Sequence, residues 1–178
     1  MLNILITGGT GLIGQRITDL LLTKGYTVGV LSRAKNTIQN VKNFVWSEDS
    51  IDVKALEFAD VIVHLAGANV GEKRWTKKRK KEIIRSRTQS AALIRTTLLK
   101  NNISIDAFIS ASAIGYYGEG GDEKLTEDTK TVTPDFLSDV CQQWEDEAAL
   151  FGPICRFASI RIGFVIGEKS IGFLKLVQ

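Results

Sequence analysis

The chain has 178 residues, of which 44% are hydrophobic and 24% are charged, which is ordinary for one globular domain with a sizeable core. It has no apolar run near the roughly 18 residues that span a bilayer, and its start, "MLNILITGG", lacks the features of a signal peptide. The two cysteines form no CxxC pair and no metal-ligand pattern. We therefore expect a cytoplasmic protein with reduced thiols, no membrane partner and no bound metal.

The net charge of +3 is unevenly distributed along the chain. Residues 72–87 hold nine basic and two acidic side chains, a local charge of +7, so the remainder carries about −4. A basic run of this kind is a feature of nucleic-acid sites. Because no aromatic residues are interleaved with it over a surface, we expect a solvated helix face or a patch that steers phosphate, and no nucleic-acid partner.

Short apolar runs alternate with segments of helical periodicity along the chain. We expect strands at residues 3–7, 26–32, 60–67, 106–112 and 157–163. Helices are expected at about 13–24, at about 76–100, and from a first turn at Pro134 to about 150. Strands that alternate with helices pair in parallel, so the sequence predicts a Rossmann-like, doubly wound α/β sheet over residues 1–168.

The last stretch, "SIGFLKLVQ" at residues 170–178, is an apolar run that begins a new element. A terminal helix packed back on the core is one interpretation. We favour residues 169–178 as the start of a C-terminal substrate region that is largely absent, or as a surface that needs a partner chain.

The turn after the first expected strand, "TGGTGLIG" at residues 7–14, is rich in glycine. Gly8, Gly11 and Gly14 have the spacing G-x-x-G-x-x-G at the start of a helix. One glycine allows the tight turn, one allows the backbone to approach a pyrophosphate, and one allows close packing of helix on strand. The free N–H groups and dipole at the helix N-terminus then favour an anion. The pattern predicts a bound dinucleotide, against a glycine-rich turn without a ligand.

The end of the second expected strand indicates which dinucleotide is bound. NAD-binding proteins place an acidic residue about 20 positions beyond the turn, where it binds the ribose 2′-hydroxyl. Here Ser32 and Arg33 lie 18 and 19 positions after Gly14, and no carboxylate is present there. A guanidinium matches a 2′-phosphate in charge and shape, which predicts NADP(H); the alternative is a surface arginine without a ligand.

Four motifs occur in the order typical of one superfamily: "TGGTGLIG", "HLAG" (64–67), "SASAIGYYG" (110–118) and "RIGFVIG" (161–167). With "HLAGANVGEKRWT", "SRTQSA" and "DFLSDVCQQWEDEA", the chain resembles the atypical extended short-chain dehydrogenases/reductases. More narrowly, it is similar to the NAD(P)-dependent epimerase/dehydratase-like, or nucleoside-diphosphate-sugar epimerase-like, subgroup. The resemblance implies a smaller C-terminal substrate lobe beyond residue 178, and a homodimer by analogy.

The resemblance also implies roles for individual residues. The active-site serine is Ser112, and the Tyr-x-x-x-Lys pair of the superfamily falls on Cys141 and Glu145. Its tyrosine moves a proton and its lysine holds the ribose. The implied cofactor contacts lie in the glycine turn and in the "HLAG" motif, which matches the turn after the fourth strand of the superfamily. They are Gly8, Thr10, Gly11, Leu12, Ile13, Gly14, Leu65, Ala66 and Gly67.

Neither residue at the pair suits its role. A thiol is a weak proton donor, and the negative charge of Glu145 raises rather than lowers a neighbouring pKa. Cys141 is therefore expected to pack in the core, with Trp144 as a packing anchor. Tyr116 and Tyr117, close to Ser112 in sequence, are candidates to supply the missing hydroxyl, against a role in loop packing.

Two further polar residues need an interpretation. His64, the single histidine, ends an apolar run and is interpreted as a satisfied core residue. Arg87, with Arg74, is a candidate to hold a cofactor phosphate or a small anionic substrate.

The sequence leaves two functions open. One is an NADP-dependent oxidoreductase or epimerase that acts on a small anionic, nucleotide-sugar-like substrate. The other is a non-catalytic module that binds NADPH as a sensor or structural group. The glycine turn is compatible with both functions, and the residues at the Tyr-x-x-x-Lys positions favour the second function or a changed mechanism. We expect the first function, because Ser112 and the residues for an anionic ligand are still present.

Overall fold

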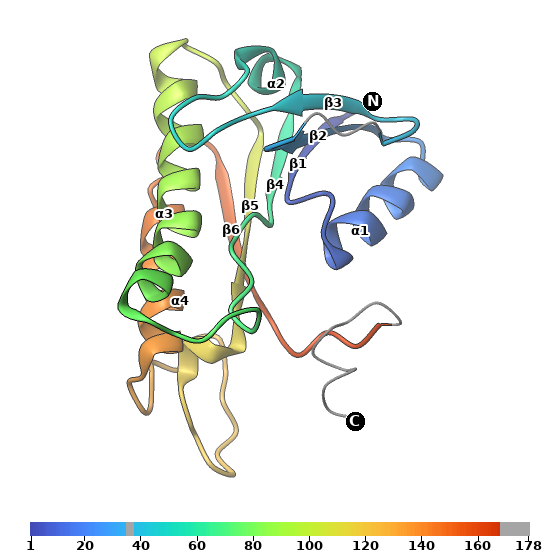
Figure 1. Cartoon of the computed structure of the whole chain (residues 1–178). Coiled ribbons are helices and arrows are strands. Elements are labelled where there is room, and N and C mark those ends of the chain that lie inside the picture. The colour runs from blue at the N-terminus through green and yellow to red at the C-terminus, as the bar shows by residue number, and fades with distance from the viewer. Residues whose placement is uncertain (35–37, 168–178) are drawn as a thin grey trace.

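The computed structural model describes residues 1–34 and 38–167, so the expected substrate region at 169–178 lies outside the described residues. Its strands and helices alternate along the chain, except that the third strand follows the second directly (Figure 1). The strands are β1 (Asn3–Thr7), β2 (Thr27–Ser32), β3 (Lys42–Val45), β4 (Val61–His64), β5 (Ala107–Ala113) and β6 (Arg156–Ile162). The helices are α1 (Leu12–Thr23), α2 (Val53–Phe58), α3 (Lys77–Lys100) and α4 (Phe136–Ala149), with a 3-10 helix η1 (Ile114–Tyr117).

The six strands form one sheet in the order β3-β2-β1-β4-β5-β6, and each neighbouring pair is parallel. The chain builds β1, β2 and β3 outward in one direction and then returns to place β4 beside β1. The predicted Rossmann-like, doubly wound sheet is therefore confirmed. Because all strands are parallel, their carboxyl ends, and the residues that follow them, lie at one edge.

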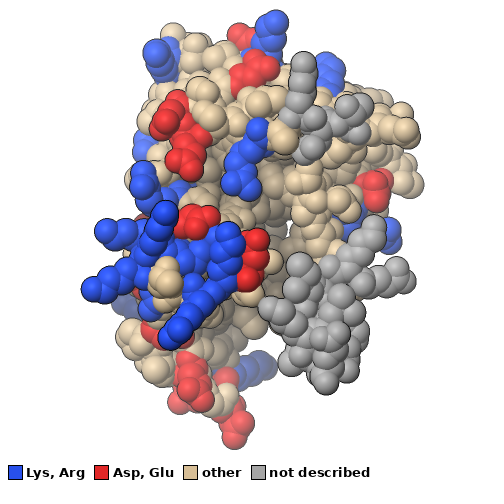
Figure 2. Space-filling model, in the orientation of Figure 1, with Lys and Arg blue, Asp and Glu red and all other residues tan. Residues whose placement is uncertain are grey.

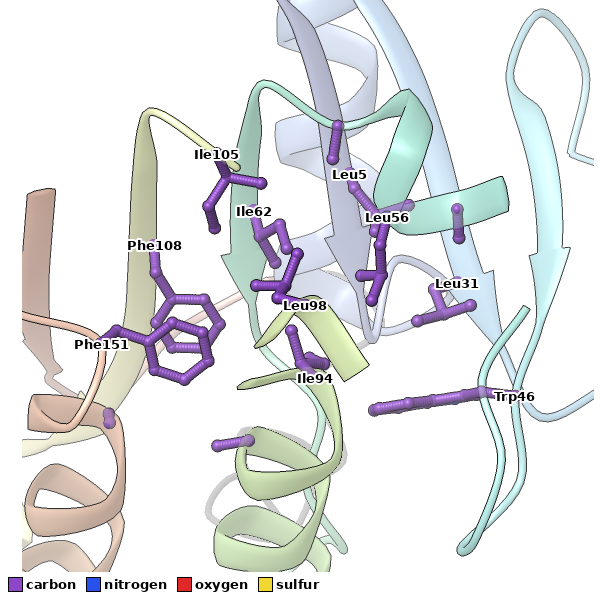
Figure 3. Close-up of a cluster of buried hydrophobic side chains, with 14 residues drawn as sticks. Leu5, Leu31, Trp46, Leu56, Ile62, Ile94, Leu98, Ile105, Phe108 and Phe151 are labelled. Atoms are coloured by element: carbon purple, nitrogen blue, oxygen red, sulfur yellow. The ribbon is translucent and has the colours of Figure 1, made fainter. Parts of the chain in front are cut away.

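Helices cover both faces of the sheet, with α1 on one side and α3 and α4 on the other (Figure 1). Alternation along β1 sends Ile4 and Ile6 toward α1, while Leu5 points to the opposite face. The larger cluster joins Leu5 to Phe108 of β5 and to Ile94 of α3 (Figure 3). Burial of this apolar surface fixes the sheet under the carboxyl edge where the site lies.

One strand and one α-helix were not predicted, because neither carries a long apolar pattern; the 3-10 helix η1 was not predicted either. Three of the four residues of β3 are exposed, and α2 has six residues, too few for clear helical periodicity. Residues 65–67, which we expected to extend a strand, follow the end of β4 at His64.

The expectation that Pro134 lies in the first turn of α4 is wrong. The Asp135 carboxylate accepts a hydrogen bond of 2.7 Å from the Ser138 N–H, and the Ser138 hydroxyl accepts one from the Asp135 N–H. This capping box places the first helical residue at Phe136. Among the described residues, no helix is both long enough and apolar enough to cross a bilayer.

Candidate nucleotide-binding and active site

The strand order reverses between β1 and β4, and in doubly wound sheets ligands bind outside the carboxyl ends of the strands at this point. The two strand ends are tied together by buried polar groups. The Thr7 hydroxyl lies 2.8 Å from Nδ1 of His64 and accepts a hydrogen bond of 3.2 Å from the Ala66 N–H. On the other side of the ring, Nε2 of His64 lies 3.0 Å from the Ser90 hydroxyl of α3. These bonds hold the turn after β4 against the end of β1.

His64 is a core residue, as predicted. Its side chain is fully buried, and both ring nitrogens have hydroxyl partners. The Ser90 hydroxyl donates to the backbone carbonyls of Ser86 and Arg87, so it accepts from Nε2, and Nδ1 accepts from Thr7. Burial lowers the pKa of His64 to about 4, so the ring is neutral near pH 7.

The glycine turn at residues 7–14, hereafter the phosphate turn after its predicted ligand, is packed too closely against other backbone atoms for side chains at two positions. A Cβ on Gly14 would lie 2.4 Å from the carbonyl oxygen of Gly8. Gly8 has a positive φ of 72°, and a Cβ there would lie 2.9 Å from the carbonyl carbon of Leu65. Two of the three roles assigned to these glycines, the tight turn and the close packing at the start of the helix, are therefore present, and the phosphate turn abuts residues 65–66.

The N-terminus of α1 has no side-chain cap. Its N-cap residue is Gly11, which has no side chain to offer, whereas Asp52, Thr76 and Asp135 cap the other three described α-helices. The first N–H groups of a helix have no partner within the helix. At α1 these belong to Leu12, Ile13 and Gly14, so the helix presents amide donors and a positive dipole end at the switch point. These are the groups that hold a pyrophosphate in dinucleotide-binding folds.

The proposed 2′-phosphate contacts lie at the end of β2. The Ser32 hydroxyl donates to the Ala34 carbonyl, and Arg33 is exposed. Arg33 forms no salt bridge with residues 1–34 or 38–167. Its guanidinium is thus uncommitted at the edge where the adenosine end of a dinucleotide lies in this fold.

The end of β5 carries a three-residue network. The Ser112 hydroxyl is buried and donates a hydrogen bond of 2.6 Å to Oε1 of Glu145 on α4. Arg161 of β6 binds the same carboxylate through two bonds of 2.9 Å, one from Nε and one from Nη2. The hydrogen bonds to Glu145 raise the pKa of Arg161 further above its already high value. The guanidinium therefore offsets the negative charge that made Glu145 unsuitable as a neighbour of an acid–base group.

Tyr116 and Tyr117 join this network through Arg161. The Nη1 group of Arg161 donates to the Tyr117 hydroxyl at 2.9 Å and to the backbone carbonyl of Glu127 at 3.0 Å. Its guanidinium carbon lies 3.5 Å from the centre of the Tyr116 ring and 4.9 Å from that of Tyr117. Because the Tyr117 oxygen accepts from Arg161, its own hydroxyl proton remains free to donate to another group.

The two residues at the expected Tyr-x-x-x-Lys positions face different surroundings. Cys141 is 4% exposed, and burial raises the pKa of its thiol, so it is a neutral group packed on α4. Trp144 is also buried, in agreement with its predicted packing role. Glu145, by contrast, is held by Ser112 and Arg161 at the end of the sheet.

The basic run forms an exposed patch over the start of α3 (Figure 2). Lys77, Lys78 and Lys81 are exposed, as expected for a solvated helix face. Arg79 is different: it is 5% exposed and pairs with Glu72 and Glu82. One residue of the run therefore anchors α3 to the segment before it instead of facing solvent.

Comparison with known proteins agrees with this geometry. The sequence profile of the NAD dependent epimerase/dehydratase family matches residues 4–138, three quarters of the chain. The chain belongs to this family.

The relatives of this family member are longer than the chain. It is 36% identical over 173 residues to the epimerase family protein YfhF of Bacillus subtilis, covering 95% of the chain and 57% of YfhF. Among solved structures, it matches human epimerase family protein SDR39U1 with NADPH at a TM-score of 0.81 and 27% identity, covering 98% and 58% of the two chains. It matches a nucleoside-diphosphate sugar epimerase of Corynebacterium glutamicum at a TM-score of 0.81 and 32% identity, covering 99% and 37%. The chain thus spans little more than half the length of the curated relatives.

In this family member, the predicted site residues fall into three groups along the carboxyl edge. The phosphate turn contacts residues 65–66, and Gly67 contacts the guanidinium of Arg87, so these predicted cofactor residues are brought together. Ser112 lies with Glu145 at the β5 end. Ser32 and Arg33 follow β2, on the other side of β1.

Arg161 was not predicted as a site residue. A signal was present, because "FASIRIG" places a charged residue between two isoleucines inside a strand. Alternation along β6 puts Arg161 on the same face as Phe157, which packs in the core on the α3 and α4 side of the sheet. A charge on that face requires a partner, and the partner is Glu145.

Proposed function

We propose that the chain binds NADP(H) and serves an oxidoreductase or epimerase reaction on a small anionic, nucleotide-sugar-like substrate. The observation that carries the proposal is the uncapped N-terminus of α1, with the free amides of Leu12, Ile13 and Gly14 at the point where the strand order reverses. The exposed Arg33 supports a 2′-phosphate, since its guanidinium at the end of β2 forms no salt bridge with the described residues. SDR39U1, with 27% identity, was solved with NADPH.

The residues of the chain suit distinct tasks in such a reaction. A bound nicotinamide supplies hydride transfer. The Ser112 hydroxyl donates its proton to the Glu145 carboxylate, which fixes its orientation, so its oxygen is left to accept a hydrogen bond from a substrate hydroxyl. Tyr117 is the candidate to replace the tyrosine of the Tyr-x-x-x-Lys pair in proton transfer. Its hydroxyl oxygen is fixed by a hydrogen bond from Arg161, which leaves its proton available to donate.

The cofactor assignment is tested by titration with NADPH and NADH. Loss of a charge-assisted contact costs about 1.5–3 kcal/mol, so Arg33→Ala is expected to weaken NADPH binding by roughly 10–150-fold and to leave NADH binding almost unchanged. Equal losses for the two cofactors would contradict the assignment to the 2′-phosphate.

One observation favours the alternative of a non-catalytic NADPH-binding module. Cys141 is buried with a raised pKa, and Glu145 is engaged by Arg161, so neither is free to act as the proton-transfer pair. A screen of nicotinamide absorbance with NADPH, sugar nucleotides and small carbonyl compounds separates the two functions. Turnover that is lost in Ser112→Ala with Tyr117→Phe supports the enzyme, and tight NADPH binding without oxidation by any compound supports the module.

A further inference from the structure

Arg87 differs from the other arginines that pack inside the described part of the chain. Arg79 pairs with Glu72 and Glu82, Arg95 with Glu147, and Arg161 with Glu145. Within residues 1–34 and 38–167, Arg87 has no carboxylate partner. Buried charges in proteins are normally paired, so a missing partner for a largely buried guanidinium calls for an explanation.

The hydrogen bonds of Arg87 divide its guanidinium into two sides. Nη1 donates to the backbone carbonyls of Ala68, at 3.1 Å, and Ile83, at 2.9 Å, and these bonds fix the side chain between the turn after β4 and α3. Nε is buried without a partner among the described residues. Nη2 makes no hydrogen bond with them either, so the Nε–Nη2 edge is unused. This edge is the fork that binds phosphate or carboxylate through two parallel hydrogen bonds.

The described residues around the Arg87 guanidinium hold it in place and supply no negative charge. Its carbon lies 4.9 Å from the centre of the Trp144 ring, and a Cβ on Gly67 would lie 3.0 Å from it. Burial lowers the pKa of Arg87 to about 10. The Cys141 thiol is close enough to interact, but burial raises its pKa, so it is neutral near pH 7.

The position of Arg87 relates it to the ligand site. Gly8 of the phosphate turn abuts Leu65, and Gly67, two residues on, contacts Arg87. Arg87 therefore lies beyond the phosphate turn, on the side of α4 and Ser112. The pyrophosphate amides at α1 belong to a different part of the site.

We propose that Arg87 is a receptor for an oxyanion, a phosphate or carboxylate group, bound by its Nε–Nη2 edge. The oxyanion comes either from the substrate or from the cofactor, and this part of the inference rests on the proposed function. The existence of the anion site does not, because inorganic phosphate tests it without a nicotinamide.

The first test is a titration of the chain with inorganic phosphate, followed by NMR of the arginine Nε–H groups. The Arg87 resonance, assigned by its loss in Arg87→Lys, is expected to shift and saturate. Arg95 is an internal control, because its Nε is also buried without a partner while its Nη2 is paired with Glu147. Absence of a saturable shift at Arg87, with phosphate and with NADPH, would overturn the proposal.

The second test uses matched variants. Arg87→Lys keeps the charge but loses the fork, so phosphate binding is expected to weaken by about 10–150-fold, whereas Arg95→Lys leaves it unchanged. Equal phosphate binding in both variants would show that the surface lysines bind the ion and would overturn the proposal.

Repeating the titration with saturating NADPH distinguishes the two sources of the anion. A phosphate-dependent shift that persists assigns Arg87 to the substrate. A shift caused by NADPH itself, to which phosphate adds nothing, assigns it to the cofactor. Either result supports the anion site. If the wild-type chain does not bind NADPH, the proposed function is refuted, but the result with inorganic phosphate still tests the anion site.

Discussion

Acidification from pH 7 to pH 5 is expected to destabilise the chain by about 2 kcal/mol through His64 alone. This residue is fully buried, and its neutral ring accepts from Thr7 and donates to Ser90. A second proton on Nδ1 would remove the acceptor of the Thr7 hydroxyl proton, and both groups are fully buried. Protonation would therefore also disturb the junction between β1 and the turn after β4.

The sign and size follow from the two pKa values. His64 has a pKa of about 4 in the folded chain and 6.5 as its ordinary value. Between these values the unfolded chain binds the proton and the folded chain does not, so stability falls as the pH falls through this window. The full difference of about 2.5 pH units corresponds to about 3 kcal/mol, of which about 2 kcal/mol is lost by pH 5.

The assay is urea unfolding at several pH values, for the wild type and for His64→Gln, which can keep one donor and one acceptor without titrating. Because the chain has one histidine, the difference between the two slopes isolates His64. A wild-type stability that is flat between pH 7 and pH 5, or an equal slope in the variant, would refute the reasoning.

Three further predictions concern the site. Gly14→Ala places a Cβ 2.4 Å from a backbone oxygen, so it should cost about 1–3 kcal/mol in urea unfolding and weaken NADPH binding, while Gly163→Ala, with nothing within 4 Å, should do neither. Arg161→Met removes the partner of the partly buried Glu145 carboxylate and should lower the free energy of unfolding by about 1.5–3 kcal/mol. Arg161→Lys should recover part of this loss. An unchanged free energy of unfolding in Arg161→Met would show that the Ser112, Glu145 and Arg161 network does not stabilise the fold. With a thiol reagent at neutral pH, Cys155, which is half-buried, should react before the buried Cys141, and rapid labelling of Cys141 would contradict its packed environment.

The parts of the molecule that could be predicted from the sequence are those whose structure follows from a pattern of neighbouring residues. The phosphate turn has a spacing that follows from backbone geometry, and the buried strands β1 and β5 show as apolar runs. The edge strand β3 and the short helix α2 could not be predicted, since their stability comes from pairing with β2 and from packing, which no short pattern records.

The site divides in the same way. Ser112 was predicted by resemblance. Its partner Glu145 was interpreted only as the residue at the position of the superfamily's lysine, and the ion pair between Glu145 and Arg161 was not predicted. The two charged residues are 16 positions apart in the sequence and meet only because α4 packs over β6. Such a contact depends on tertiary geometry, so neither residue alone indicates it.

The most direct test of the central claim is NMR mapping of backbone amides on addition of NADPH. If the N-terminus of α1 holds the pyrophosphate, the amides of Leu12, Ile13 and Gly14 should show the largest shifts, saturating with the binding curve. Tight binding that leaves these three amides unchanged, or an absence of binding, would contradict the account.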